Sequence, residues 1–184
     1  MGLFFFLGKN GAGKTTFFNC IMGFEDFQGE IVKPERIATV LDESYLYDNL
    51  NGIDNIFLLI GRNLLQEEKA FLQEYIDGNV LKRKVRSYSL GQKKILSILI
   101  ALFTRPEMLI LDEVSNGLDH ETGKLIKSLM LSCKNEMLIL VCGHQFEFYN
   151  RILDEVFVIN DTELVQVDRN EFTDLEQVYE KYVG

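Results

Sequence analysis

The chain of 184 residues is long enough for one domain with a hydrophobic core, and its composition (47% hydrophobic, 26% charged, 2 prolines) excludes a disordered protein. A net charge of −9, from 28 acidic and 19 basic residues, argues against binding to nucleic acid, which requires clustered positive charge. The 3 cysteines show no metal-ligand spacing, and no apolar run approaches the ~20 residues that cross a bilayer, so we expect a protein of the reducing cytoplasm.

The first half of the chain predicts strands and helices in alternation, followed by a helical insert. LFFFL at 3–7 is apolar at every position, which is typical of a parallel strand buried on both faces, and TTFFNCIMGF at 15–24 has helical length. GEIVK at 29–33 and RIATVL at 36–41 predict two short strands. Residues 51–86 show helical spacing broken by glycines, which predicts a compact insert of two or three helices.

The second half predicts the same alternation again. The expected helices are 93–105, 120–133, 146–154 and 172–183, and the expected strands are 108–112, 137–143, 155–160 and 163–168. Strands that alternate with helices indicate an α/β fold with a mainly parallel sheet.

A phosphate-binding loop follows the first predicted strand. GKNGAGKT at 8–15, hereafter the phosphate loop, matches G-x-x-x-x-G-K-[ST]. Its glycines let backbone N–H groups converge on phosphates, Lys14 would bridge the β- and γ-phosphates, and the Thr15 hydroxyl would bind Mg²⁺. The alternative is a glycine turn without a ligand, but the strand–loop–helix context favours a nucleotide site. The other positions that we expect to contact the nucleotide are Asn10, Gly11, Ala12, Gly13 and Thr16.

Two acidic residues end the predicted strand in MLILDE at 108–113. Asp112 can hold Mg²⁺, often through water, and Glu113 beside it can polarise an attacking water. Apolar strands that end in an acidic residue are common, so this pattern indicates a catalytic site only in combination with the phosphate loop.

A third segment, YSLGQKK at 88–94, leads into the predicted helix 93–105, and its first five residues, YSLGQ, are hereafter the signature segment. By itself it is an ordinary helix start with Ser89 as the cap. Together with SNGLD at 115–119 and VCGHQ at 141–145, however, the chain resembles the ATP-binding cassette (ABC) ATPases, whose five motifs occur here in family order. The resemblance covers nearly the whole chain.

The resemblance implies a P-loop NTPase core in which two nucleotide-binding domains sandwich two ATP molecules head to tail, with Mg²⁺. Ser89, Gly91 and Gln92 would then bind the γ-phosphate held by the opposite protomer, and Asp119 would make contacts across the dimer interface. His144 would reach the γ-phosphate and fix the attacking water, although a lone histidine is more often a core residue. We predict one domain, residues 1–184, with a nucleotide-binding core at 1–50 and 87–184 and a helical subdomain at 51–86.

Several positions depart from the family pattern. Asp42 stands where the family has a glutamine that touches Mg²⁺, and we expect it to keep a metal- or water-binding role with a shorter reach. Leu90 replaces the commonest glycine of the signature, and Val114 replaces a proline. The leucine variant and the compact insert resemble the ATPases of bacterial peptide-export and bacteriocin-immunity systems.

Family members usually carry antiparallel strands before the phosphate loop, with an aromatic residue that stacks on adenine. We expect these strands to be truncated here, because only seven residues precede Gly8. Since stacking on a base contributes ~1–3 kcal/mol, we expect ATP to be bound roughly ten- to a hundredfold more weakly.

Three functions remain open. The leading one is a transporter motor, peripheral on the cytoplasmic face of the membrane, that works as a homodimer or heterodimer of nucleotide-binding domains with a separate transmembrane permease. A soluble ABC-type ATPase acting on ribosomes, DNA or protein assemblies is disfavoured by the acidic charge. A weakly active regulatory nucleotide-binding module is favoured by Asp42 and disfavoured by Lys14, Asp112 and Glu113.

We expect the permease to contact a groove between Asp42 and Ile60. Apolar side chains concentrate in this stretch, namely Tyr45, Leu46, Tyr47, Ile53, Ile56 and Phe57. Of these, Ile56 and Phe57 are expected to pack internally.

Overall fold

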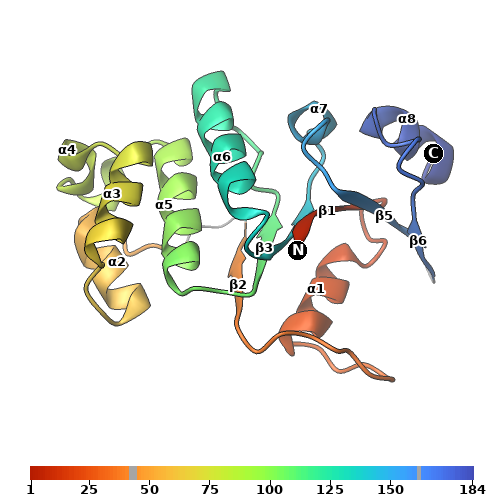
Figure 1. Ribbon diagram of the computed structural model, residues 1–184, viewed down its shortest axis with the longest axis horizontal. Coiled ribbons are helices and arrows are strands. Elements are labelled where there is room, and N and C mark those ends of the chain that lie inside the picture. Colours follow the sequence, from red (N-terminus) through yellow and green to blue (C-terminus); the bar gives the residue numbers. More distant parts are fainter. Residues whose placement is uncertain (42–44, 161–162) are drawn as a thin grey trace.

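The computed structural model describes residues 1–41, 45–160 and 163–184 of the chain (Figure 1). The strands are β1 (Gly2–Leu7), β2 (Ile37–Val40), β3 (Met108–Asp112), β4 (Leu138–Cys142), β5 (Glu155–Asn160) and β6 (Glu163–Gln166). The α-helices are α1 (Lys14–Met22), α2 (Gly52–Ile60), α3 (Gln66–Tyr75), α4 (Gly78–Leu81), α5 (Leu90–Phe103), α6 (His120–Cys133), α7 (Phe146–Tyr149) and α8 (Leu175–Tyr182), with a short 3₁₀ helix at Val85–Ser87.

The six strands of the described residues form one sheet in the order β2-β3-β4-β1-β5-β6. Every neighbouring pair is parallel except β5 and β6, which form an antiparallel edge. In the register of the central strands, Phe6 of β1 and Asp112 of β3 both lie opposite Cys142 of β4. The loops that follow β1, β3 and β4 therefore leave the sheet at the same edge, which is where parallel α/β sheets build their sites.

The sheet is covered on both faces, as the continuous apolar run in β1 predicts (Figure 1). Leu3, Phe5 and Leu7 belong to the larger core, which also includes residues of α5, α6, α7 and α8. Phe6 faces the opposite way, into a smaller core with Phe18 of α1. The mainly parallel α/β sheet predicted from the sequence is thus confirmed, with α1 and α5 on opposite faces.

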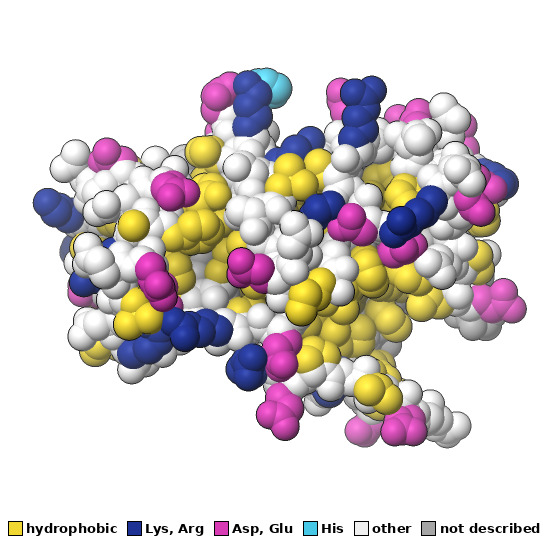
Figure 2. Space-filling view, in the orientation of Figure 1, with side chains coloured by type: hydrophobic (Ala, Val, Ile, Leu, Met, Phe, Trp, Pro, Cys, Tyr) yellow, Lys and Arg dark blue, Asp and Glu magenta, His cyan; other side chains and the backbone are white. Residues whose placement is uncertain are grey.

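The face that carries α1 is the more thinly covered one. Phe4, Phe17, Phe157 and Ile159 are only partly buried there. Figure 2 shows hydrophobic side chains gathered over α1 and the adjoining strands β1 and β5.

The strand predicted at 29–33 is wrong, because residues 23–36, all of which the structure describes, contain no strand. This segment lies at the surface, and Val32 in it is 93% exposed. A short β-prone run becomes a strand only where a neighbouring strand accepts its hydrogen bonds and a core buries one of its faces. The strand predicted at 36–41 is present as β2.

No helix in the described ranges is long and apolar enough to cross a membrane.

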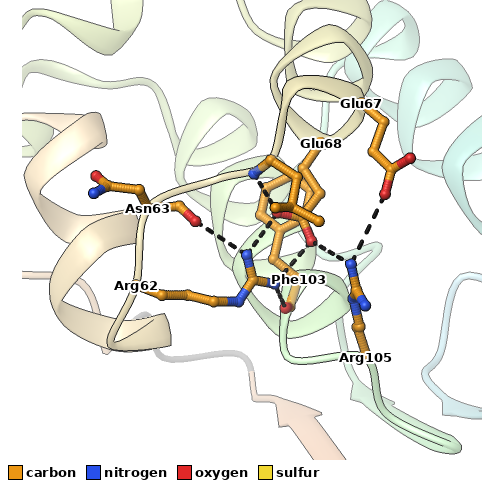
Figure 3. A network of polar contacts seen from close by, with 7 residues as sticks. Arg62, Asn63, Glu67, Glu68, Phe103 and Arg105 are labelled. Carbon is orange, nitrogen blue, oxygen red and sulfur yellow. Dashed lines mark hydrogen bonds and ion pairs between the residues drawn. The ribbon is translucent and has the colours of Figure 1, made fainter.

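An ion pair between the buried Glu68 and the partly exposed Arg62 fastens α3 to the end of α5 (Figure 3). Both carboxylate oxygens of Glu68 accept hydrogen bonds from the Arg62 guanidinium, each at 2.7 Å. The same guanidinium donates to the Phe103 carbonyl at 2.8 Å, and the Leu65 N–H donates to Glu68 Oε2 at 2.8 Å. Hydrogen bonds from Arg62 lower the pKa of Glu68 from 4.5 to about 2.

Replacing Glu68 by glutamine should lower the free energy of unfolding by about 1–3 kcal/mol at pH 7, because a charged and doubly bonded carboxylate is lost. A carboxyl group whose pKa is lowered stabilises the fold fully above its unfolded value of 4.5, and this stabilisation is lost as the pH falls through about 2. The difference between the two proteins should therefore be smaller at pH 3 than at pH 7, which urea unfolding at both pH values measures.

Glu67→Gln is the matched control. The Glu67 side chain is 77% exposed and lies 3.8 Å from Arg105, so its loss should change the free energy of unfolding by less than about 0.5 kcal/mol. Equal losses for the two variants would contradict the role given to Glu68.

Candidate nucleotide-binding and catalytic site

The phosphate loop joins the end of β1 to the start of α1. Gly11 and Gly13 have φ of 83° and 94°, in the left-handed region that favours glycine. Gly13 is the N-cap of α1 and offers no side-chain cap, so the first N–H groups of the helix stay available for an anion. A side chain on Gly8 would collide with the Ile159 carbonyl, because its Cβ would lie 2.7 Å from that oxygen.

Lys14 folds back over this loop. Its Nζ donates to the carbonyls of Gly8 at 2.7 Å and Lys9 at 3.0 Å, which holds the ammonium against the loop. Thr15 and Thr16 lie exposed in the first turn of α1. The predicted phosphate ligands, including Asn10, Gly11 and Ala12, therefore surround one accessible helix N-terminus.

Asp112 ends β3 at the same edge of the sheet. The Cys142 thiol of β4 donates to Asp112 Oδ1 at 2.6 Å. Burial, followed by the nearby Asp112 carboxylate, raises the pKa of the Cys142 thiol far above its usual value, so the thiol stays protonated and remains a donor. This contact fixes one oxygen of Asp112, and among the described residues no hydrogen bond occupies the other, which is left for a ligand.

The structure brings Glu113 and His144 together. His144 Nε2 lies 3.4 Å from Glu113 Oε1, with the imidazole half-exposed. Glu113 Oε2 is buried and has no hydrogen-bond partner within the described part of the chain. Gly143 lies beside it, and a Cβ there would be 3.4 Å from Glu113 Oε2. Glu113 also has φ of 54°, a conformation that costs a side-chain-bearing residue energy and recurs at functional sites.

The signature segment begins α5. Ser89 and Gln92 cap the helix reciprocally, because the Gln92 N–H donates to Ser89 Oγ and the Ser89 N–H donates to Gln92 Oε1, both at 3.1 Å. Gly91 is buried against Thr122 of α6. These residues lie on the opposite face of the sheet from α1, so the structure does not bring them to the phosphate loop of their own protomer.

Asp119 is the N-cap of α6. It accepts hydrogen bonds from the Thr122 N–H at 2.9 Å and from Thr122 Oγ1 at 2.7 Å, and these bonds lower the pKa of its carboxyl group. The contact across a dimer interface expected for Asp119 remains a prediction. Asp42, the predicted metal or water ligand, lies outside the described residues.

A sequence model of a protein family described as ABC transporter matches residues 2–116. The chain belongs to the ABC transporter family. It is 30% identical over 172 residues to the lantibiotic transport ATP-binding protein SrtF of Streptococcus pyogenes, which covers 86% of this chain and 75% of that protein. It is also 33% identical over 180 residues to the bacitracin transport ATP-binding protein BcrA of Enterococcus faecalis, covering 87% of this chain and 58% of that one.

Solved ABC transporter structures share the fold. An ATP-binding subunit of an ABC transporter superposes with a TM-score of 0.80 at 20% identity and covers 98% of this chain and 87% of that chain. Membership of the ABC transporter family confirms the resemblance drawn from the five motifs, and with it an ATPase subunit that powers transport.

Sequence reasoning missed two residues of this ABC transporter site, Cys142 and the buried Lys94. Cys142 stands inside VCGHQ and Lys94 inside YSLGQKK, but neither side chain has an assigned role in those segments. The Cys142–Asp112 contact depends on the register between β3 and β4, which no local pattern in the chain reveals.

Proposed function

We propose that the chain binds ATP with Mg²⁺ at the phosphate loop and hydrolyses it to drive a separate membrane permease. The observation that carries the proposal is the convergence of the phosphate loop, Asp112 and the Glu113–His144 pair at one edge of the sheet. In this mechanism the water oxygen bonds to the γ-phosphorus while the bond to the ADP oxygen breaks. Glu113 accepts the proton of the water, and His144 donates a hydrogen bond to the γ-phosphate.

Thr15 and Asp112 would hold Mg²⁺. Hydroxyl and carboxylate oxygens are the ligands that Mg²⁺ prefers, and the thiol contact leaves one Asp112 oxygen for this purpose. When bound, the ion supplies positive charge that neutralises the phosphate oxygens. Asp42 is proposed as a further ligand from the sequence alone.

A head-to-tail dimer would complete the site. Ser89, Gly91 and Gln92 begin a helix on the far face of the sheet from α1, so they are suited to a nucleotide held by a second nucleotide-binding domain. Since the N-terminus of a helix attracts anions, α5 would bind the γ-phosphate of the partner. We propose a homodimer or heterodimer on this basis.

The permease would dock at the groove between β2, α2 and α5. A cavity of about 360 Å³ opens there, with Tyr45, Leu46 and Leu59 among its lining residues. Ile53 and Phe57 of α2 lie outside this cavity, and they are 51% and 48% exposed. The expectation that Phe57 packs internally is therefore wrong, whereas Ile56 is buried as expected. Exposed apolar side chains in such number are typical of an interaction site. A subunit docked there would lie on the cytoplasmic face of the membrane. The groove would then join the nucleotide-binding core, residues 1–50 and 87–184, to the helical subdomain, residues 51–86.

Removing Mg²⁺ with EDTA should abolish ATP hydrolysis by the purified chain, and Asp112→Asn should raise the Mg²⁺ concentration for half-maximal turnover about tenfold. Steady-state phosphate release against Mg²⁺ concentration measures both effects. Asp154→Asn is the control, since this carboxylate binds Lys134 at the opposite end of the sheet from Asp112 and should leave the Mg²⁺ dependence unchanged. Binding of ATP without any Mg²⁺-dependent turnover would favour the regulatory module instead.

A further inference from the structure

Lys94 is a buried lysine that none of the five motifs explains. It lies on α5, five residues after Ser89, and its side chain is only 4% exposed. Its Nζ donates to the carbonyl of Glu113 at 3.1 Å and to the carbonyl of Asn116 at 2.8 Å. Burying an ammonium group is costly, so an apolar residue would stabilise the fold more simply if packing were its only role.

The backbone that Lys94 holds is the strained turn after β3. Glu113 has φ of 54°, and its N–H donates to the Cys142 carbonyl at 3.1 Å. The Asn116 N–H donates to the Glu113 carbonyl at 3.1 Å, which closes the turn. Both carbonyls at the ends of this turn therefore point at one ammonium group. A strained conformation persists only where its surroundings over-determine it, and Lys94 supplies two of those constraints.

We propose that Lys94 is a positioning residue that fixes the turn 113–116, and through it the carboxylate of Glu113. The proposal rests on the role of Glu113 as general base in the proposed function. Because Lys94 belongs to the helix that the signature segment begins, a displacement of α5 would be transmitted to Glu113 through these two hydrogen bonds. The start of α5 would bind the γ-phosphate of the nucleotide held by the partner, whereas Glu113 acts on the nucleotide held by the phosphate loop of its own protomer. Lys94 would in this way couple phosphate binding at the first site to the geometry of hydrolysis at the second.

The neighbouring lysine provides a contrast within the same helix. Lys93 pairs with Asp48 at 2.7 Å, is 23% exposed, and reaches the outside of the fold instead of the turn. An ion pair of this kind contributes little, typically below 1 kcal/mol. Lys93 and Lys94 are thus the same residue type on the same helix. They differ in their partners, because Lys93 pairs with an exposed carboxylate and Lys94 donates to the backbone of the turn.

The test compares Lys94→Met with Lys93→Met in steady-state ATP hydrolysis. Lys94→Met should lower kcat about tenfold while KM for ATP and the Mg²⁺ dependence change less than about twofold, because the phosphate loop and Asp112 are untouched. Lys93→Met should keep the wild-type kcat. Lys94→Gln, which keeps a donor but is shorter and uncharged, should fall between Lys94→Met and the wild type.

A folded Lys94→Met protein, judged by its thermal unfolding midpoint, with wild-type kcat would overturn the proposal. Should Lys94→Met not fold, Lys94→Gln carries the test alone, and wild-type kcat in that variant overturns it. A loss of both ATP binding and kcat in Lys94→Met would also count against positioning, since it indicates a general structural role. If Glu113→Gln retains full turnover, the proposed function itself fails, whatever the Lys94 variants do.

Discussion

Glu113→Gln should lower the turnover number for ATP hydrolysis by about 10²–10⁴-fold while leaving ATP affinity close to that of the wild type. Glutamine keeps the size of the side chain but cannot accept the proton of the attacking water. The carboxylate lies 3.4 Å from His144 and directly follows the Mg²⁺ candidate Asp112. Because glutamine has the same size, the substitution should remove the base and leave the phosphate loop undisturbed. Single-turnover phosphate release and equilibrium ATP binding separate the two effects.

A second consequence concerns assembly. If ATP closes a dimer and hydrolysis opens it, the slow variant should accumulate as an ATP-bound dimer, which light scattering in the presence of ATP and Mg²⁺ detects. Glu107→Gln is the control, because Glu107 lies just before β3 at its other end and is 47% exposed. A Glu113→Gln protein that hydrolyses ATP at the wild-type rate, or a Glu107→Gln protein equally impaired, would show that Glu113 is not the base.

The parts of this site that local sequence patterns encode were predictable. The phosphate loop needs glycines at fixed offsets between a strand and a helix, and the strand LFFFL and the helix after it are both present as β1 and α1. Ser89 was predicted as a helix cap, and it caps α5 together with Gln92. Each of these features depends on residues that lie within one short stretch of the chain, so a local sequence pattern is enough to predict it.

The features that were missed depend on tertiary geometry. Cys142 touches Asp112 only because β3 and β4 pair in one particular register, and Lys94 reaches Glu113 only because α5 packs beside the turn after β3. The strand wrongly predicted at 29–33 also depends on tertiary geometry. Its local sequence pattern fits a strand, but the described fold offers no partner strand beside it. Residue spacing shows which residues are close in the sequence, whereas strand register and helix packing determine which side chains are in contact in the fold.

Gly91→Ala should lower kcat about tenfold to a hundredfold with little change in ATP affinity. The Cβ of an alanine there would lie 2.8 Å from Thr122 Oγ1 and closer still to Thr122 Cγ2. Thr122 cannot easily turn away, because its N–H and its hydroxyl are both bonded to Asp119. Overpacking of this kind costs about 1–3 kcal/mol, and that strain would push the start of α5 away from α6.

The effect on turnover follows from what α5 carries. Displacing its first turn moves the signature segment and pulls on the two hydrogen bonds that join Lys94 to the turn at Glu113. The double variant Gly91→Ala with Thr122→Ala should recover part of the lost kcat, because it removes the two atoms that collide, while Thr122→Ala alone reports the cost of losing the hydroxyl bond to Asp119.

Gly78→Ala is the matched control, since a Cβ on this helical glycine meets no atom within 4 Å. It should keep wild-type kcat and unfold at an equal or slightly higher temperature, because alanine restricts the unfolded chain more than glycine does. If Gly91→Ala were as active as Gly78→Ala, or if removing Thr122 Cγ2 and Oγ1 restored nothing, close packing between α5 and α6 would not be what holds the signature segment in its working position.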